Sequence, residues 1–250
     1  MSSTVPQLII LGAVVSGCRA SAPHTEGHGP GHGEVHAAAA AAGHGEGHGA
    51  GHGAHGPDHF ADPAQFVAAW NAPDRDAYQK PEEIVAALGL APGQTVVDLG
   101  AGTGYLLPPL VSAVGPEGVV IAADIEQAML TFLGDAAKKE GWGNVRLHLS
   151  AMNDPSLPPQ SVDSVVTLNV WHHIEGRPAY AALVLQTIKP GGVFVIVDFL
   201  KEETEGFGPP LSMRLSADEV MAELVAGGFE AEIVPETMPR HYVVRGRRPL

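Results

Sequence analysis

The sequence of 250 residues has one cysteine, Cys18, and half as many basic as acidic side chains. With one cysteine, the chain cannot form an internal disulfide, so disulfides contribute nothing to its fold. The 14 Lys and Arg residues against 28 Asp and Glu residues give a formal net charge of −14. Because phosphates attract basic surfaces, this balance argues against nucleic acid or an anionic membrane surface as a partner.

The N-terminus also lacks a long apolar run. Its apolar residues, LIILGAVV at positions 8–15, are too few to span a bilayer as a helix. The run ends in VSGC, and it resembles the signal peptide of a bacterial lipoprotein, although residues 1–7 lack the usual Lys or Arg. The resemblance implies a signal peptide over residues 1–17, a lipid on Cys18, and export to the periplasmic side of the membrane. A cytoplasmic protein with an uncleaved apolar N-terminus is the alternative.

Residues 18–59 form a low-complexity segment rich in Gly, Ala and His. Nine of the 13 histidines occur there: His24, His28, His32, His36, His44, His48, His52, His55 and His59. Glycine at this density disfavours a stable helix, so we expect a disordered tether. Imidazoles bind zinc, copper or nickel, which leaves a metal-binding lipoprotein as an alternative function.

The most informative stretch of the remaining domain, residues 60–250, is VVDLGAGTGY at residues 96–105. An apolar run carries Asp98 near its end, and a helical segment follows over about residues 105–114. Three alternating glycines separate the two: Gly100, Gly102 and Gly104. Glycine tolerates positive φ and lets a ligand lie against bare backbone, while a helix N-terminus offers unpaired N–H groups. The pattern therefore predicts a strand, a tight turn and a helix start that together bind a ligand.

The spacing of the glycines distinguishes two cofactor classes. Dinucleotide sites use G-x-G-x-x-G, which places a pyrophosphate on the helix N-terminus. Here the third glycine comes one residue early, and Asp98 stands two positions before the first. A carboxylate repels a pyrophosphate and attracts an ammonium group. The stretch thus resembles motif I of the class I S-adenosylmethionine-dependent methyltransferases, and an NAD-dependent oxidoreductase is a less favoured alternative.

Alternating apolar and amphipathic segments continue to the end of the chain. Strands are expected at residues 119–124, 145–149, 162–170 and 193–199, followed by two antiparallel strands at residues 231–236 and 241–247. Helices are expected at residues 62–71, 82–88, 105–114, 177–188 and 216–229, and after residue 125. The resemblance implies an α/β fold, a Rossmann-like three-layer sandwich whose seven-stranded sheet is mostly parallel with an antiparallel edge strand.

The resemblance also implies the residues that bind S-adenosyl-L-methionine. The residues implied to bind the methionine half are Asp98, Gly100, Ala101, Gly102, Gly104 and Tyr105. Asp124 ends the second strand, where a carboxylate can accept both ribose hydroxyls, and Ile125 follows it. The family's adenine-binding acid is replaced by Ala151, so Asn153 or Asp154 takes that role with Met152 packing on the ring. Asn169 is placed in the cofactor site as well.

The segment after the fourth strand, WHHIEG, lies beside the methyl-transfer centre in the family. His172 or His173 is a candidate general base, and Trp171 a candidate cation–π partner of the sulfonium. If the backbone is extended there, the two adjacent histidines point to opposite faces. The alternative is that neither performs chemistry. Two polar stretches, residues 78–80 and 201–211, are either lids or surface loops.

The sequence therefore predicts an S-adenosylmethionine-dependent methyltransferase that acts on a small-molecule acceptor, and it predicts no oligomeric state. An exported domain would be separated from cytosolic S-adenosylmethionine, so a second hypothesis is a lipid-anchored binding protein without turnover. A metal-binding lipoprotein that works through its His-rich tract is the third.

Overall fold

The computed structural model describes residues 62–203 and 207–250. The predicted signal peptide at residues 1–17, Cys18 and the His-rich tether at residues 18–59 lie outside the described residues. Within the described ranges, no helix is both long enough and apolar enough to cross a membrane.

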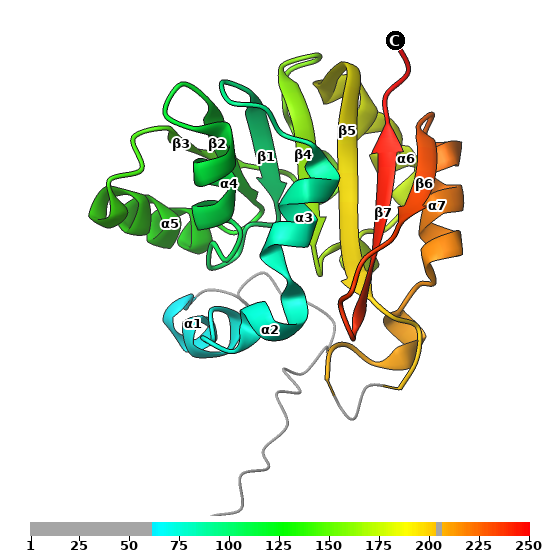
Figure 1. Ribbon diagram of the computed structural model, residues 1–250, viewed down its shortest axis with the longest axis horizontal. Coiled ribbons are helices and arrows are strands. Elements are labelled where there is room, and N and C mark those ends of the chain that lie inside the picture. Colours follow the sequence, from blue (N-terminus) through cyan, green and yellow to red (C-terminus); the bar gives the residue numbers. More distant parts are fainter. Residues whose placement is uncertain (1–61, 204–206) are drawn as a thin grey trace, which may run out of the picture. The chain divides into compact units, whose positions relative to one another are not determined.

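The domain is built around one seven-stranded sheet with the strand order β3-β2-β1-β4-β5-β7-β6 (Figure 1). The strands are β1 (Thr95–Leu99), β2 (Val119–Asp124), β3 (Val145–Leu149), β4 (Val162–Leu168), β5 (Ile188–Phe199), β6 (Glu230–Val234) and β7 (His241–Arg247). Strands β1 to β5 run parallel, and β7 runs antiparallel to both of its neighbours, β5 and β6. This arrangement confirms the expected Rossmann-like α/β fold.

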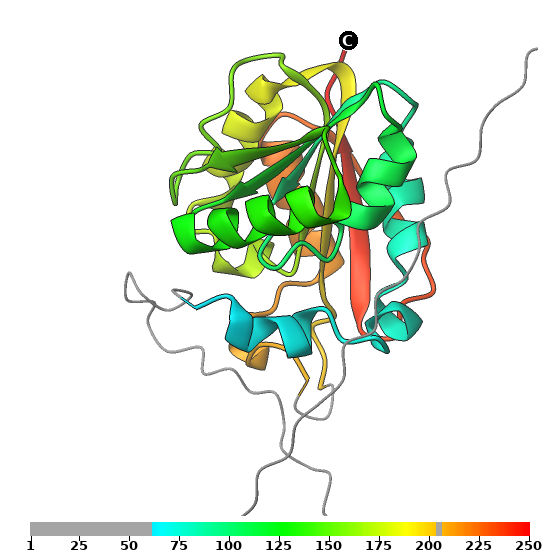
Figure 2. The same ribbon diagram turned by 90° about the vertical axis from the view of Figure 1, so that its left-hand side faces the viewer.

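Helices cover both faces of the sheet. The α-helices of the described residues are α1 (Ala64–Trp70), α2 (Arg75–Gln79), α3 (Pro81–Leu88), α4 (Leu107–Val114), α5 (Gln127–Glu140), α6 (Arg177–Thr187) and α7 (Ala217–Ala226). Two short 3₁₀ helices are η1 (Trp171–His173) and η2 (Leu211–Met213). Figure 2 shows α3 and α4 on one side of the sheet and α6 on the other.

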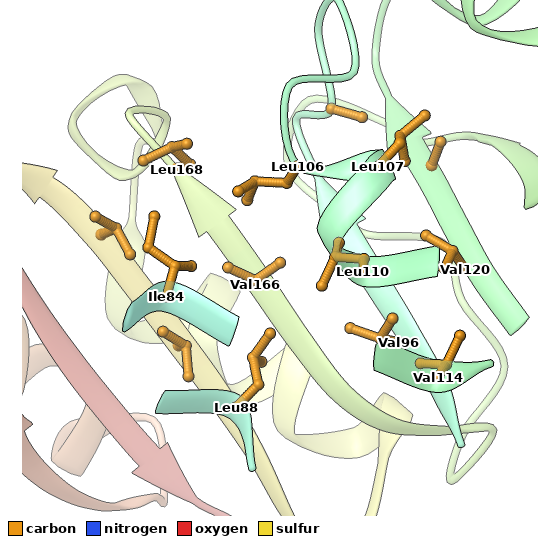
Figure 3. Packing of buried hydrophobic residues seen from close by; sticks show 14 of the residues in the cluster. Ile84, Leu88, Val96, Leu106, Leu107, Leu110, Val114, Val120, Val166 and Leu168 are labelled. Carbon is orange, nitrogen blue, oxygen red and sulfur yellow. The ribbon is translucent and has the colours of Figure 1, made fainter. Parts of the chain in front are cut away.

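Two apolar clusters hold these layers together. On one face, α3 and α4 bury a cluster that includes Ile84, Leu88 and Leu110 (Figure 3). On the other face, α6 and α7 bury a cluster that includes Val184 and Leu224. Each such side chain stabilises the fold by about 1.5–3 kcal/mol when it leaves water. The central strands are therefore buried on both sides, which explains their continuous apolar sequences.

The sheet brings acidic residues to one edge, because the carboxyl ends of parallel strands lie together. Asp98 in β1 is paired with Ala122 in β2 and with Val166 in β4. Asp124 ends β2 and lies opposite Leu149 of β3. The strand order reverses between β1 and β4, and open α/β sheets bind their ligands at such a switch point.

Three local predictions of secondary structure differ from the structure. Residues 75–79, where no helix was expected, form α2. Strand β5 begins at Ile188, five residues before the strand expected at residues 193–199. Its pairing with β4 shifts register between Val162 and Ser164, so the additional residues of β5 form a bulge. Strand β4 ends at Leu168, two residues earlier than expected.

Candidate active site

The glycine loop after β1 is held against the neighbouring strand β2. The backbone N–H groups of Gly100 and Ala101 both donate to the carbonyl of Ala123, at 2.8 and 3.0 Å. Gly100 has a φ of +79°, and a Cβ atom there would lie 2.5 Å from Cγ2 of Val170. Glycine is therefore required at this position by its backbone conformation and by the close approach of the loop that follows β4.

Asp98 presents a buried carboxylate beside this loop. Its side chain is 3% exposed, and burial raises its pKa to about 7. The nearby charge of Asp124 also raises this pKa, whereas the guanidinium of Arg75 lowers it. Ionised Asp98 is destabilised by the loss of water, so a cationic group bound beside it would be strongly favoured. These properties suit the ammonium group of an amino-acid ligand.

Asp124 is fixed in place at the end of β2 by the backbone around it. Its Oδ2 accepts the N–H of Gly102 at 2.9 Å, and its Oδ1 accepts the N–H of Glu126 at 3.0 Å. Burial raises the pKa of this carboxyl group as well. A carboxylate has about four acceptor sites, so both oxygens can still accept hydroxyl groups of a ribose.

Two exposed apolar side chains lie at the same edge of the sheet. Ile125 follows β2 and is 45% exposed, and Met152 follows β3 and is 73% exposed. Because β2 and β3 are neighbouring parallel strands, these side chains offer apolar surface where the predicted adenine site lies. Ala151 and Asp154 exchange backbone hydrogen bonds of 3.0 and 3.3 Å and close a tight turn there.

The adenine contacts assigned to Asn153 and Asp154 stay predictions. Both residues are exposed in this turn. The Oδ1 atom of Asp154 accepts the N–H of Ser156 at 2.6 Å, which stabilises the turn itself. The other oxygen of this carboxylate can still accept the exocyclic amine of adenine.

Helix α1 and the residues after it cover the glycine loop. The ring of Trp70 lies so close to Gly102 that a Cβ atom there would be 3.2 Å from Cζ3. Nδ2 of Asn71 donates to the carbonyl of Thr103 at 3.1 Å, and Oγ1 of Thr103 donates to Oδ1 of Asn71 at 2.6 Å. Two reciprocal hydrogen bonds and one aromatic contact thus hold α1 on motif I.

Helix α2 extends this cover with charged and aromatic side chains. The hydroxyl of Tyr105 donates to Oδ1 of Asp76 at 2.7 Å, and the guanidinium of Arg75 lies 3.8 Å from the centre of the Tyr105 ring. Burial lowers the pKa of Arg75 and raises the pKa of Tyr105. Arg75 also donates to the carbonyl of Trp70.

The contacts that a lid at residues 78–80 would make with the glycine loop are therefore made by residues nearer the N-terminus. Contacts with motif I come from Trp70 to Asp76, whereas the Nε2 atom of Gln79 faces the sulfur of Met238 at 3.9 Å. Sequence reasoning missed Asn71 and Arg75 in this role. The available signal was a polar segment directly after the amphipathic α1.

Near the end of β5, His172 is paired with Asp198, a residue that the sequence analysis did not single out. Nδ1 of His172 lies 2.8 Å from Oδ1 of Asp198, and the backbone N–H of His172 donates to Oδ2 at 3.0 Å. The side chains are 2% and 3% exposed. Because a carboxylate only accepts, Nδ1 carries the proton and Nε2 is the basic nitrogen.

Asp198 occupies the same position in β5 that acidic residues occupy near the ends of other strands. Asp98 is the penultimate residue of β1, Asp124 ends β2, and Asp198 is the penultimate residue of β5. An acid near the end of an apolar strand was therefore the signal that would have identified it.

His173 lies beside His172 and not on the opposite side of the chain. The two ring centres are 4.1 Å apart, and residues 171–173 form the 3₁₀ helix η1. The alternation expected for an extended backbone does not apply, because a 3₁₀ turn places successive side chains closer together in direction than a strand does.

The predicted contact of Trp171 with the sulfonium was wrong. Trp171 is 0% exposed and lies in the cluster beneath α6 and α7, edge to face with Tyr180 and Phe194. Its Nε1 donates to Oε2 of Glu223 at 2.9 Å. The indole is thus part of the core.

Asn169, assigned to the cofactor, lies where the chain leaves β4. It has a φ of +59°, and its N–H donates to the carbonyl of Val197 at 2.9 Å. Its buried Oδ1 has no hydrogen-bond partner among the residues that the structure describes. A ligand contact by this amide stays a prediction.

The stretch at residues 201–211 is organised around the buried Arg214. The side chain of Arg214 donates to the carbonyls of Leu200, Glu202, Phe207 and Pro209. Residues 204–206 of the predicted lid lie outside the described part of the chain. Within the described ranges, no group of three or more His, Cys, Asp or Glu side chains could hold a metal ion.

Comparison with known proteins relates this geometry to one family. The family model described as "Methyltransferase domain" matches residues 90–230. Nocamycin O-methyltransferase of Saccharothrix syringae is 30% identical over 162 residues, which cover 63% of this chain and 54% of that protein. The ubiquinone/menaquinone biosynthesis C-methyltransferase UbiE of Vibrio parahaemolyticus is 32% identical over 151 residues, covering 57% and 56%. The chain thus spans about half the length of these curated relatives.

A solved structure is similar over most of its length. The crystal structure of a SAM dependent methyltransferase from Aquifex aeolicus aligns with a TM-score of 0.69 and 29% sequence identity. The alignment covers 75% of this chain and 98% of that one.

Proposed function

Because this chain belongs to the methyltransferase-domain family, whose model matches residues 90–230, we propose that it methylates a small-molecule acceptor. S-adenosylmethionine is the cofactor of this family. The observation that carries the proposal is the pair of buried carboxylates, Asp98 and Asp124, beside a glycine loop at the switch point of the sheet.

The residues present fit this cofactor. Asp98, with its raised pKa, would hold the ammonium group, and Asp124 would accept the ribose hydroxyls. Gly100 and Gly102 have positive φ angles of +79° and +52°, which shape the loop that would hold the methionine half. Bound S-adenosylmethionine supplies an electrophilic methyl group on a positively charged sulfur atom.

The chain itself contributes positioning, exclusion of water and a base. Trp70, Asn71 and the α2 residues cover the glycine loop and shield the site from solvent. His172 takes a proton from the acceptor at Nε2, and Asp198 holds the ring through Nδ1 and stabilises the imidazolium that results. Positioning of the reactants is a large contribution that a protein can make to such a displacement.

The relatives support methyl transfer, but their names do not indicate whether the acceptor atom is oxygen or carbon. One is named for O-methylation and another for C-methylation. Both reactions need an acceptor that loses a proton, which is the role proposed for His172. A lipid-anchored binding protein without turnover is the alternative, and it would keep the carboxylate pair without needing the His172–Asp198 pair.

Titration calorimetry of the full chain with S-adenosylhomocysteine tests the cofactor site. We expect Asp98→Asn to abolish measurable binding. The matched control is Asp163→Asn, which removes a carboxylate at the opposite end of the strands, where Asp163 binds the N–H of Thr95 at 2.8 Å. Absence of binding by the folded wild-type chain would overturn the proposal.

Turnover separates the enzyme from the binding protein. Consumption of S-adenosylmethionine is followed with a panel of hydroxylated and carbon acceptors. We expect His172→Gln to retain cofactor affinity and to lose activity. Binding without consumption across the panel would favour the alternative.

We also propose that the protein is exported and anchored through a lipid on Cys18, on the grounds of its N-terminal sequence. Membrane fractionation of cells that carry the wild-type chain or Cys18→Ser tests this proposal. Release of the variant into the soluble fraction supports it, and equal distribution of both contradicts it.

A further inference from the structure

Helix α1 covers the glycine loop that the proposed function assigns to the cofactor. The ring of Trp70, the last residue of α1, packs on Gly102. The next residue, Asn71, is joined to Thr103 by two hydrogen bonds of 3.1 and 2.6 Å. Figure 1 shows α1 beyond the end of the sheet, outside the layer to which α3 and α4 belong. The helix therefore lies on the loop without being part of the core.

The carboxylates beside the loop have little contact with solvent. Asp98 is 3% exposed, and Asp124 is 8% exposed. Ala101 and Thr103, in the loop itself, are also buried. A ligand with an amino-acid half and a nucleoside half is too large to reach such groups while everything that covers them stays in place. Part of the cover therefore has to move when the cofactor enters or leaves.

Helix α1 is the part of this cover that burial fixes least. All seven residues of α1 are at least partly exposed. In α2, by contrast, Arg75 and Gln79 are buried, and α3 buries Ile84 and Leu88 in the core. Segments with few buried side chains open at a lower free energy than the core does. We therefore expect α1 to leave the loop while α2 and α3 stay in place.

The connection between α1 and α2 suits such a movement. Pro73 and Asp74 are exposed, and a single turn joins the N–H of Arg75 to the carbonyl of Ala72 at 3.0 Å. Ala72 precedes a proline, which favours extended backbone at this residue. A short exposed connection can absorb the change in backbone angles that a hinge requires.

Resting on the proposed function, we infer that α1 is a gate for the cofactor. It turns about residues 72–74, opens when S-adenosylmethionine enters or S-adenosylhomocysteine leaves, and closes on the glycine loop between these events. Asn71 is the latch, because its two hydrogen bonds with Thr103 exist only in the closed state. When the gate opens, these groups exchange their hydrogen bonds for hydrogen bonds to water at a small net cost.

Stopped-flow binding of S-adenosylhomocysteine to the full-length protein tests the gate through the rates of binding and release. Asn71→Ala removes both hydrogen bonds of the latch, so the gate is open for a larger fraction of the time. We expect both rates to increase about tenfold. The dissociation constant, which is the ratio of the two rates, should change less than either. Loss of a direct contact with the ligand would instead alter the release rate alone.

The matched control is Asn144→Ala, at the opposite end of the strands. The side chain of Asn144 donates to the carbonyls of Gly115 and Gly118 at 3.0 and 3.1 Å. This variant also removes two hydrogen bonds of an asparagine, but it does so far from the glycine loop. We expect it to leave both rates unchanged.

A reversible cross-link tests the same movement from the closed state. Asn71→Cys and Thr103→Cys are combined with Cys18→Ser, which removes the single cysteine of the chain. We expect oxidation to block the binding of S-adenosylhomocysteine and a reductant to restore it. Protein that is loaded with S-adenosylhomocysteine before oxidation should retain it during dialysis.

Three outcomes would overturn the inference: unchanged rates in Asn71→Ala, an increase of its release rate alone, or fast binding by protein whose disulfide has been verified. In each of these cases S-adenosylhomocysteine still binds the wild-type chain, so the proposed function stands. Failure of the folded wild-type chain to bind S-adenosylhomocysteine refutes the proposed function, and the gate with it.

Discussion

The imidazole of His172 donates from Nδ1 to the carboxylate of Asp198, 2.8 Å away and 26 positions later in the chain. A second bond, from the backbone N–H of His172 to the same carboxylate, fixes the 3₁₀ turn on the end of β5. The pair therefore determines both the orientation of the ring and the nitrogen that carries its proton. Each of the other carboxylates of the site, Asp98 and Asp124, lies at or near the end of its own strand.

Replacing Asp198 with Asn is expected to move the imidazole proton of His172 from Nδ1 to Nε2. An amide can donate to Nδ1, which would place the imidazole proton on Nε2 and remove the basic nitrogen from the acceptor. We expect kcat to fall by about 10²–10⁴-fold with little change in cofactor affinity. Nitrogen NMR of the imidazole reports the tautomer directly. An unchanged tautomer with lowered stability would show that Asp198 has only a structural role.

The buried Asp98 makes the stability of the ligand-free protein depend on pH. Its pKa is about 7 in the folded protein against an ordinary value of 3.8. Protons therefore bind the folded state more tightly, and this contribution to stability is complete below pH 3.8 and is lost as pH rises through about 7. Denaturation of wild type and Asp98→Asn at a series of pH values measures it. The change of the unfolding free energy with pH should be smaller in Asp98→Asn than in the wild type.

The same titration predicts the opposite trend for cofactor binding. Ionised Asp98 attracts the ammonium group, so affinity for S-adenosylhomocysteine should rise as pH increases through about 7. Calorimetry across this range measures the change. A flat profile in the wild type would contradict the assignment of Asp98 to the ammonium group.

Gly100→Ala is expected to be more damaging than an alanine at another glycine with positive φ. Gly89 has a φ of +61°, and a Cβ atom there would meet nothing within 4 Å, so Gly89→Ala measures backbone strain alone, about 1–2 kcal/mol. Gly100→Ala adds a steric clash with Val170 at 2.5 Å. We expect a larger loss of stability and a loss of cofactor binding. Equal losses in the two variants would show that the approach of Val170 is unimportant.

The two tryptophans at positions 70 and 171 should behave differently. Trp70→Ala removes the ring that covers Gly102 and should weaken cofactor binding by about tenfold, which corresponds to about 1.4 kcal/mol of binding free energy. Trp171→Phe removes the hydrogen bond to Glu223 in the core and should lower stability by about 1–3 kcal/mol, with unchanged cofactor affinity. Calorimetry and chemical denaturation measure both. Impaired cofactor binding in Trp171→Phe would restore the role that its burial argues against.

The local sequence was sufficient for the order of the strands, for every α-helix of the described residues except α2, and for the glycine loop after β1. Apolar runs of strand length, the acid in β1 and the alternating glycines are properties of neighbouring residues, and they predicted β1, the loop and α4 correctly. The helix expected from residue 216 is confirmed for the same reason, and it begins with a capping box of Ser216 and Glu219. Such features depend on backbone preferences over a few residues.

Tertiary structure decided which side chains meet. The pairing of His172 with Asp198, the burial of Trp171 beneath α6 and α7, and the cover of Trp70 on Gly102 each join segments that are distant along the chain. Sequence periodicity states which face of an element is apolar, but not which other element covers it. That choice depends on the packing of the whole sheet and its helices, because burial and hydrogen bonding are satisfied by partners that only the complete fold brings within reach.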